Sequence, residues 1–548
     1  MTIPLRQVES DRNAAPSGVG LVAAWGVLLG GVAFVALPAF GVARSLVGGV
    51  TSGRVTSASL TPSAGLLLTT GAWCVGVAVL ATALALPAGW WLGRRGGRAA
   101  WWAGGLTMLF PSFLSYAAYG LARAPGTWTG DLIARAAERG WTNLPVLAGR
   151  VVAAGGLALW AWPLAALIVA WGVRAIPREA LDSLRLDVPG RGRRAWHVVR
   201  MVRAQAAASV GVIALLMAGS AVPLHLAQAP TYSVRVWLEL TTSPGSPAAW
   251  AASWPLLVLG VGGAVWLGGT VARVRMPGGE EPAGALGPAS GAAAWFWGLV
   301  VLSTAVPAGL MAGSLTSLRP LLDFWTLSGA ALGASTVTAA IAGILGGALC
   351  VGVWIALSVG GGGARRVVRA AGIVWFVGAL TPGVLVGQAL STAWTGWDAL
   401  LESPFAPAFA HVVRFGAIGV VIGVLLAGTE RASERDLRAI DGQGGLGGFL
   451  RVVVRGRAMA AAGVGAAIAC LSLHEIETGV LLQPPGTPSF AQIMLGYLHF
   501  SRLDDLAAAV VWLLALGGVA GGLGALVAAR LAPHPCVARR STIPPESA

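Results

Sequence analysis

Long apolar runs, separated by short segments that contain arginine, dominate this chain. Many of these runs reach the roughly 20 residues that a helix needs to cross a bilayer. Hydropathy along the chain predicts an all-α integral membrane protein with twelve spans. We place these spans at 20–43, 64–92, 99–121, 145–172, 206–228, 249–272, 292–314, 327–358, 367–391, 405–429, 458–482 and 506–530.

The arginines alternate with these spans. If the N-terminus is cytoplasmic, most of the 37 basic residues fall in segments that face the cytoplasm, and each such segment carries at least two. This distribution is the positive-inside bias of membrane proteins. We therefore expect a multi-pass membrane protein with both termini in the cytoplasm.

The composition supports this interpretation and excludes several function classes. Apolar residues make up 56% of the chain and charged residues 11%, against about 25% charged residues in soluble domains. The chain contains no lysine, so it cannot form the phosphate-binding loop that needs one, and ATP hydrolysis would have to occur on another chain. The net charge of +15 comes from scattered arginines, so we expect no nucleic-acid partner. We also expect no enzymatic activity, cofactor or resident metal, because no catalytic or metal-binding motif is present.

A repeated pattern divides the chain into two halves. Segments 94–100 and 365–371 both contain two arginines, a third arginine and two alanines at the same spacing, and Pro111 and Pro382 follow at equal distances. Basic loops arising by chance would explain the arginines but not the matched alanines and prolines. The pattern predicts two parallel six-helix repeats related by an axis along the membrane normal. The predicted division is a tail at 1–19, a first half at 20–272, a linker at 273–291, a second half at 292–530 and a tail at 531–548.

Two inward segments are longer than simple turns and occupy equivalent places. They are 173–205, between the fourth and fifth spans, and 430–457, between the tenth and eleventh. Each begins with a polar stretch long enough for one or two helical turns. A short helix outside the bilayer can insert into a groove on a partner and transmit its movement to the adjoining spans. The alternative is that both are solvated loops which only determine topology.

The second of these loops contains an Asp-Gly step at Asp441-Gly442, preceded by Asp436-Leu437-Arg438 and followed, thirteen residues after the glycine, by Arg455. It resembles the EAA motif of binding-protein-dependent ABC transporter permeases, in which Glu-Ala-Ala precedes Asp-Gly and a proline closes the motif at that spacing. Val188 replaces the glycine in the first loop, and valine resists a turn that glycine permits. The resemblance assigns coupling to an ATPase to Asp182, Arg185, Asp187, Val188, Asp436, Arg438, Asp441 and Gly442.

The segment that follows, 471–487, begins Leu-Ser-Leu-His-Glu and reaches a Pro-Pro-Gly turn at Pro484. It resembles the second half of fused permeases of the iron(III) importer type. The resemblance implies a permease of the bacterial cytoplasmic (inner) membrane that lacks its own ATPase domain. The implied partners are a separate ABC ATPase subunit, in two copies, and a periplasmic or lipid-anchored solute-binding protein, besides membrane lipid. Iron(III) as the substrate is suggested by the resemblance alone, and another small ion or solute remains the alternative.

Two carboxylates lie within the eleventh predicted span. His474 directly precedes Glu475, and Glu477 follows two residues later. Ionisable groups inside a membrane are candidates for function, so we expect these three residues to be candidates for the translocation path. In a helix the two glutamates would face different sides, and we favour Glu475 as the residue near the translocation path. A structural, hydrogen-bonded glutamate is the alternative. Ala221 occupies the position equivalent to Glu475 in the first half, so a symmetric metal site is not predicted.

Four further polar side chains fall at or within predicted spans. Arg150 and Arg414 lie near the outer ends of the fourth and tenth spans, where long basic side chains usually extend towards the interface. His225 and His411 are isolated in sequence. We interpret both histidines as ordinary helix residues.

Two other functional classes compete with an ABC permease. A secondary transporter of the major facilitator type would also have two parallel six-span halves, and the Gly/Arg-rich segment 93–98 matches the position of a loop in that family. That segment lacks the family's aspartate, and the central segment 273–291 is short. A membrane scaffold without transport function is the third possibility, but the sequence predicts no soluble domain.

Overall fold

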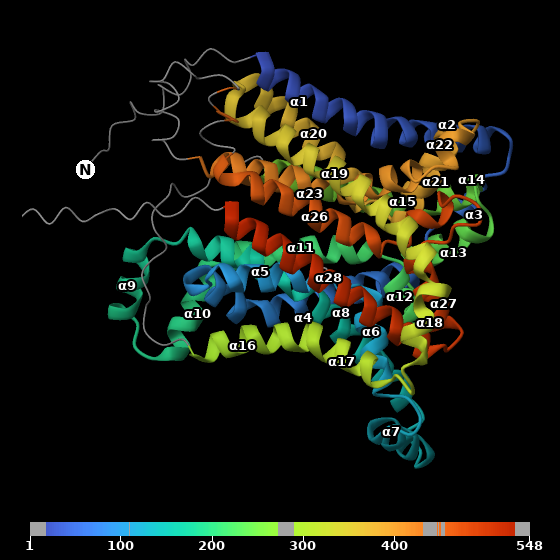
Figure 1. Cartoon of the computed structure of the whole chain (residues 1–548), viewed down its shortest axis with the longest axis horizontal. Helices are drawn as coiled ribbons and strands as arrows, with labels where there is room; N and C mark the ends of the chain where they lie inside the picture. The colour runs from blue at the N-terminus through green and yellow to red at the C-terminus, as the bar shows by residue number, and fades with distance from the viewer. Residues whose placement is uncertain are drawn as a thin grey trace, which may run out of the picture.

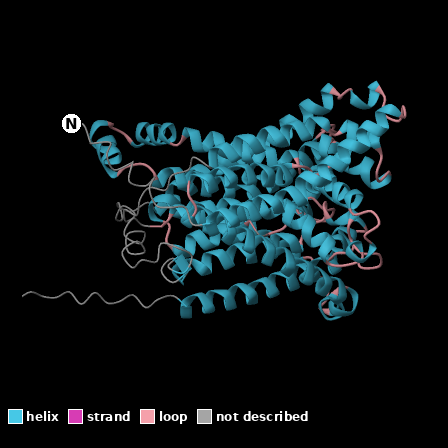
Figure 2. Ribbon diagram, turned by 90° about the horizontal axis from the view of Figure 1, so that it is seen from above, coloured by secondary structure: helices cyan, strands magenta, loops and turns pink. Residues whose placement is uncertain are grey.

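The computed structural model describes residues 18–108, 110–271, 290–430, 447, 449–450 and 455–531. Throughout these residues the protein is built from helices and loops (Figure 2). Seven stretches among them are long and apolar enough to cross a membrane: Gly18–Thr51, Ala64–Arg95, Leu144–Arg174, Trp254–Val271, Gly291–Gly313, Gly329–Val359 and Phe405–Gly428. Two bent helix pairs raise the number to nine. The chain is therefore a multi-pass membrane protein.

The helices up to residue 271 include those that we call the first bundle, α4 to α15. In chain order the elements are α1 (Gly18–Gly31), the π-helical turn η3 (Val32–Ala36), α2 (Leu37–Thr51), α3 (Ser57–Leu60), α4 (Ala64–Arg95), α5 (Arg98–Thr107), α6 (Ser112–Leu121), α7 (Trp128–Glu138), α8 (Leu144–Arg174), α9 (Arg178–Asp187), α10 (Arg191–Met201), α11 (Arg203–Ala218), α12 (Val222–Leu226), α13 (Tyr232–Thr242), α14 (Pro247–Ala252) and α15 (Trp254–Val271).

The helices after residue 289 include those that we call the second bundle, α19 to α28. The elements are α16 (Ser290–Val300), the π-helical turn η4 (Val301–Ala305), α17 (Val306–Gly313), α18 (Arg319–Leu327), α19 (Gly329–Val359), α20 (Gly362–Leu380), α21 (Gly383–Ala393), α22 (Asp398–Leu401), α23 (Phe405–Gly428), α26 (Arg455–Leu473), the 3-10 turn η6 (Gly479–Leu481), α27 (Phe490–His499) and α28 (Leu503–Leu531).

The long helices run side by side between two ends of the molecule (Figure 1). We call one the arginine-rich end, because α4 ends there with Arg94 and Arg95 and α8 ends there with Arg174. The pair α9 and α10 lies at this end, whereas α7, α13, α18 and α27 lie at the opposite end. The short helices named here thus lie at two opposite ends of the molecule.

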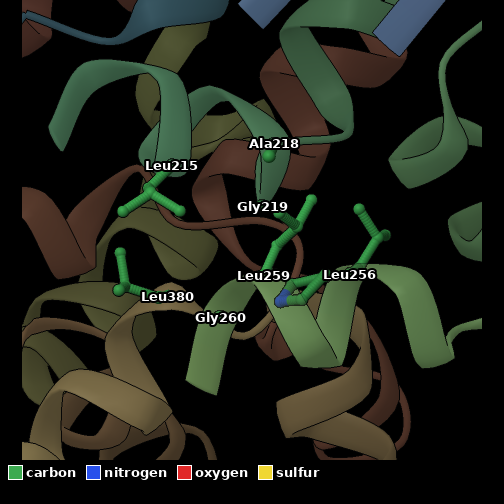
Figure 3. A pocket seen from close by; sticks show the side chains of 8 residues that line it. Leu215, Ala218, Gly219, Leu256, Leu259, Gly260 and Leu380 are labelled. Carbon is green, nitrogen blue, oxygen red and sulfur yellow. The ribbon is translucent and has the colours of Figure 1, made fainter. Parts of the chain in front are cut away.

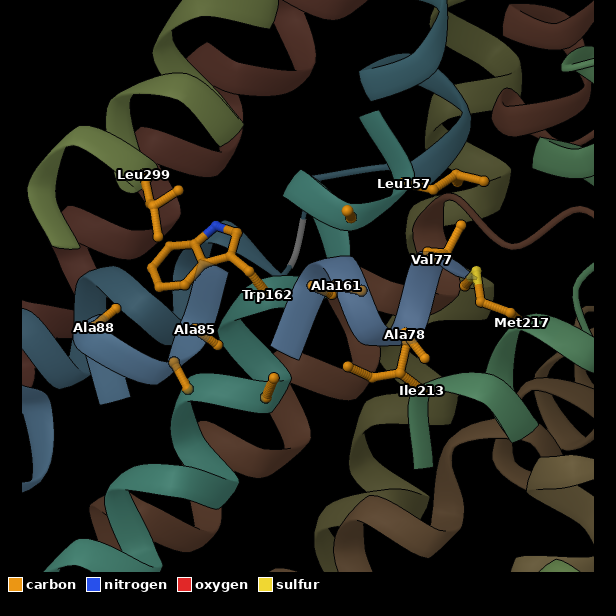
Figure 4. Packing of buried hydrophobic residues seen from close by; sticks show 14 of the residues in the cluster. Val77, Ala78, Ala85, Ala88, Leu157, Ala161, Trp162, Ile213, Met217 and Leu299 are labelled. Atoms are coloured by element: carbon orange, nitrogen blue, oxygen red, sulfur yellow. The ribbon is translucent and has the colours of Figure 1, made fainter. Parts of the chain in front are cut away.

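Small residues allow close helix contact in the first bundle. Helix α4 packs against α8 and α11, and the indole of Trp162 is buried among alanines of these helices (Figure 4). A Cβ atom on Gly89 or Gly93 would lie 2.8 or 2.6 Å from the carbonyl oxygen of Ala166 or Ala170, respectively. Glycines at this spacing are typical of helix pairs packed inside membranes.

The second bundle has the same kind of contact. Helix α19 packs against α23 and α26. A Cβ atom on Gly419 or Gly423 of α23 would lie 2.7 or 2.6 Å from the carbonyl oxygen of Gly346 or Cys350 of α19, respectively. The glycines of the α19–α23 contact therefore lie on α23, whereas those of the α4–α8 contact lie on α4.

The helix that precedes each bundle in the chain packs on the other bundle. Helix α1 lies along α19 and α20, and α16 lies along α4 (Figure 1). An indole nitrogen fixes each contact: Trp375 donates to the carbonyl of Val27 at 3.1 Å, and Trp295 donates to the carbonyl of Leu84 at 2.9 Å. This exchange interlocks the two bundles.

Four of the spans that we predicted as continuous helices are interrupted. Those at 99–121 and 367–391 break where Pro111 and Pro382 precede α6 and α21, and α20 and α21 meet at a bend of 108°. Proline lacks an N–H and disfavours helical conformation in the residue before it. The matched prolines of the sequence therefore mark breaks in two spans.

The spans predicted at 206–228 and 458–482 also end early. Helix α11 stops at Ala218 and α26 stops at Leu473, and each is followed by a short irregular segment before α12 or η6. Helix ends leave carbonyl and N–H groups without intrahelical partners, and such groups need a partner when they lie within a membrane. At the break after α11, side chains from the second bundle supply these partners.

Candidate functional site

Glu477 joins the second bundle to the first. It lies between α26 and η6, and only 5% of its surface is exposed. Its Oε1 atom accepts hydrogen bonds from the backbone N–H groups of Ala221 at 2.6 Å and Val222 at 2.9 Å, where α12 begins in the first bundle. A carboxylate therefore satisfies the N–H groups that the break after α11 leaves unpaired. Oε2 accepts no hydrogen bond from the described residues.

Arg414 of α23 makes the complementary contacts. Its guanidinium donates to the carbonyls of Ala379 at 3.0 Å and Thr381 at 2.6 Å, at the end of α20, and to the carbonyl of Gly219 at 3.3 Å in the first bundle. We predicted that this side chain extends towards the interface, and that prediction is wrong. Free carbonyls at two helix ends attract the guanidinium inwards, because water is not available there to pair with them.

The two side chains form one junction, which we define as Gly219, Ala221, Val222, Arg414 and Glu477. The guanidinium takes the acceptor and the carboxylate takes the two donors of the same break in the first bundle. Backbone groups from one bundle and two ionisable side chains from the other thus hold the bundles together at this point.

Gly383, the first residue of α21, lies against this junction. A Cβ atom there would be 2.6 Å from the Cβ atom of Glu477. Backbone and glutamate can approach so closely only because the residue is a glycine. The break after Pro382 therefore determines the position of the carboxylate as well as the direction of α21.

Glu475, which we favoured for the translocation path, has a local role in the structure. Its Oε1 atom accepts hydrogen bonds from the N–H and the hydroxyl of Thr478, at 3.1 and 3.4 Å. Residues 474 to 478 form turns, because α26 ends at Leu473, so the argument from helix faces does not apply to them. The carboxylate that connects the bundles is Glu477, and His474 precedes the turn that Glu475 stabilises.

The imidazole rings of His225 and His411, which are isolated in sequence, both contact side chains from other parts of the chain. His411 is buried, and its Nδ1 atom shares a hydrogen bond with the hydroxyl of Ser472 at 2.5 Å. The ring centroid of His225 lies 5.1 Å from that of Trp237 and 5.9 Å from that of His499. His225 belongs to α12, and His499 of the second bundle is its neighbour across the interface although the two are far apart in sequence.

An apolar seam between the bundles lies next to the junction (Figure 3). Leu215 and Gly219 of the first bundle face Leu380 across it, and Gly260 of α15 also lines it. A Cβ atom on Gly260 would lie 3.4 Å from the carbonyl oxygen of Leu380. The seam has no space for a water molecule, so the bundles are in close contact at this level.

The residues that we assigned to the first coupling loop lie at the arginine-rich end. Asp182, Arg185 and Asp187 belong to α9, and Val188 follows it in an extended conformation. The turn that a glycine was expected to make falls two residues later, at Gly190, which has a φ of +86°. Val188 is therefore compatible with a helix–turn–helix segment here. The assigned residues of the second loop, Asp436, Arg438, Asp441 and Gly442, lie outside the described residues.

Helix α9 has one leucine that faces the protein and another that faces away from it. Leu181 is 5% exposed and faces the bundle, whereas Leu186 is 86% exposed. Aspartates Asp182 and Asp187 flank these leucines in sequence. An isolated, exposed leucine on a charged helix outside the membrane-length helices is suited to contact with another protein.

In the described residues, no cluster of three or more histidine, cysteine, aspartate or glutamate side chains could hold a metal ion. Cys74, Cys350 and Cys470 are free thiols. No family model, curated protein or solved structure matches this chain. The chain is an all-helical, multi-pass membrane protein, and its first and second bundles meet at a buried, charged junction.

Proposed function

We propose that this chain is the membrane-spanning permease of an ABC importer, and that it forms the substrate path while a separate ATPase supplies the energy. The observation that carries the proposal is the α9–α10 pair, which connects two long helices at the arginine-rich end and exposes Leu186. A short helix in this position can dock into a groove of an ATPase subunit. The absence of lysine, and hence of a phosphate-binding loop, agrees with an ATPase on another chain.

The positions of helix breaks support two parallel six-span repeats. The π-helical turns η3 and η4 are each followed by a helix that begins with a proline at its second residue, Pro38 or Pro307. Pro111 and Pro382 each precede a short helix after a break. We propose that the twelve-span pattern in the sequence corresponds to these two series of elements.

A matched pair of hydrogen bonds supports the same arrangement. The hydroxyl of Thr70, the seventh residue of α4, accepts from the backbone N–H of Tyr232 at 2.8 Å. The hydroxyl of Ser335, the seventh residue of α19, accepts from the N–H of Phe490 at 2.9 Å. Each bond ties the start of a helix near the opposite end, α13 or α27, to the start of a long helix.

A continuous route connects the proposed docking helix to the junction. Helix α10 leads directly into α11, and α11 ends at Ala218, immediately before Gly219. Its 16 residues span about 24 Å as a helix. In our proposal, closure of two ATPase subunits moves α9 and α10, and α11 transmits the movement to the backbone groups that bind Arg414 and Glu477. Opening this junction lets the bundles separate along the seam.

The substrate in this proposal is a small ion or solute, with iron(III) suggested by the sequence resemblance. A solute-binding protein would deliver it at the opposite end. The transported species would pass the junction when the bundles separate, so Glu477 and Arg414 act as gate residues.

The test uses the full chain, purified from its native membrane, with Leu186→Asp as the variant. We expect the unmodified chain to bring with it an ATPase that carries a Walker motif, and to stimulate ATP hydrolysis by that subunit. Leu186→Asp should weaken the association at least about tenfold, the effect of losing a contact of about 1.4 kcal/mol. Leu318→Asp is the matched control, because Leu318 is 73% exposed and precedes α18 at the opposite end.

Two results would contradict the proposal. One is recovery of the chain without an ATPase under conditions that preserve known ABC complexes, together with solute uptake driven by an ion gradient in vesicles. That result would identify a secondary transporter of the major facilitator type. The other is equal ATPase association of the Leu186→Asp variant and the unmodified chain.

A further inference from the structure

A groove of about 420 Å³ lies between the α9–α10 pair and the long helices at the arginine-rich end. Pro87 and Trp90 of α4 and Val169 of α8 form its inner wall, and Leu184 and Val198 of α9 and α10 cover it. Pro87 is exposed, so the groove opens to the outside of the bundle. A volume of this size is typical of sites that hold a small ligand.

The groove extends into the apolar region of the molecule. Pro87 lies eight residues before Arg95, where α4 ends, which corresponds to about 12 Å along a helix. Val169 lies five residues before the end of α8. Since both helices are of membrane-spanning length, the inner wall faces the depth at which lipid acyl chains lie.

A basic side chain lies at the rim. Arg194 lines the groove and is half-buried, and its Nε atom donates to the carbonyl of Val188 at 2.8 Å. That bond fixes the guanidinium beside the apolar slot. Arg193 and Arg200 on the same helix are exposed. The groove thus combines an apolar slot with a positively charged mouth, in a segment directly adjoining the membrane.

We propose that this groove binds one anionic phospholipid, with an acyl chain between α4 and α10 and the phosphate at Arg194. Basic pockets between membrane helices on the cytoplasmic side are suited to anionic headgroups, and the apolar slot adds the burial of methylene groups. Free phosphate would gain nothing from the slot, and a zwitterionic lipid would gain less from Arg194, because its ammonium group offsets the charge of its phosphate. This lipid site is independent of the function that we propose for the chain. The bound lipid would contact α9 and α10 together with the long helices, so it would hold the pair at a fixed distance from the bundle.

The test measures lipid binding to the delipidated full chain by native mass spectrometry. The probes are phosphatidylglycerol and phosphatidylcholine with identical acyl chains, and inorganic phosphate. We expect phosphatidylglycerol to bind about fivefold more tightly than phosphatidylcholine, which corresponds to about 1 kcal/mol for one arginine near the membrane surface. Arg194→Gln should remove this preference. Arg193→Gln is the matched control and should retain it.

A second variant tests the slot independently of the charge. Val198→Trp fills the groove, and it should weaken binding of both lipids at least about tenfold, as expected for the loss of several buried methylene groups. Leu184→Phe provides a milder filling substitution if the tryptophan variant does not fold. Three results would overturn the proposal: Arg194→Gln retains the full preference, inorganic phosphate competes as strongly as phosphatidylglycerol, or a folded filling variant binds both lipids like the unmodified chain.

Discussion

The breaks after α11 and α26 both interrupt a predicted span, but they carry different ionisable side chains. In the first bundle the break contributes only the carbonyl of Gly219 and the N–H groups of Ala221 and Val222 to the junction. In the second bundle the corresponding region supplies Glu477, and the adjacent helix α23 supplies Arg414. Helix-breaking residues thus give two bundles a common framework, while the ionisable groups are carried by one of them. A shared framework does not require a symmetric site.

The close contacts between long helices show the opposite kind of difference. Both bundles use pairs of glycines that approach carbonyl oxygens, but Gly89 and Gly93 lie on α4, whereas Gly419 and Gly423 lie on α23. Here the chemistry is the same and the helix that provides it differs. Close packing needs a small residue on either partner, so the location of the glycines is less constrained than that of the charges.

The largest expected effect comes from removing one charge from the junction. Arg414→Ala leaves the carbonyls of Ala379, Thr381 and Gly219 without their donor. Each buried polar group left without a partner costs about 1–3 kcal/mol, so we expect a loss of about 3–5 kcal/mol in the free energy of unfolding. The measurement is unfolding by sodium dodecyl sulfate in mixed micelles. Arg150→Ala is the control, because Arg150 is exposed near the start of α8, and it should change stability by less than about 0.5 kcal/mol. Similar small losses in both variants would contradict the asymmetric junction.

A smaller effect is expected from enlarging the glycines. Gly93→Val and Gly423→Val each place atoms against a carbonyl oxygen of a neighbouring helix, and overpacking of this kind costs about 1–3 kcal/mol. The same unfolding measurement applies. The control is Gly76→Val in α4, where a Cβ atom would have no neighbour within 4 Å. If only one of the two bundles is destabilised, the equivalence of the two glycine contacts is lost.

The smallest effect tests the matched hydroxyls. Thr70→Val and Ser335→Ala each leave one buried N–H group without its acceptor, at a cost of about 1–3 kcal/mol, and we expect values near the lower limit for both. Thr69→Val is the control, because the Thr69 hydroxyl contacts only its own helix, at the carbonyl of Gly65. Clearly unequal losses at Thr70 and Ser335 would show that only one of the bundles depends on this bond.

The sequence predicted the membrane-length helices well, since apolar composition over about 20 residues is a local property. It also singled out Pro111 and Pro382, although only as markers of a repeat. The break after Ala218 was missed because Gly219, Ser220 and Ala221 are small and lower the hydropathy of a window only slightly. The break after Leu473 was missed because a window of about 19 residues averages His474, Glu475 and Glu477 with the apolar residues around them. A helix break is a change in the backbone, which hydropathy does not measure.

The junction itself was only partly predictable. Intramembrane carboxylates drew attention to Glu475 and Glu477, but the choice between them depended on a contact between residues 256 positions apart. Arg414 was missed for the same reason, because its acceptors are carbonyls of other helices. A buried N–H or carbonyl group at a helix end has no signature in the amino-acid sequence, so its partner cannot be recognised from residue type.

The exchange of α1 and α16 determines the order in which this protein can be completed during synthesis. Helix α1 emerges from the ribosome well before α19 and α20, on which it packs, because nearly 300 residues separate Gly31 from Gly329. The first bundle in turn lacks α16 until its own helices have been inserted. Neither bundle can be finished before the other has begun, so a truncated product leaves at least one long helix without its partners, exposed to lipid and to quality-control proteases.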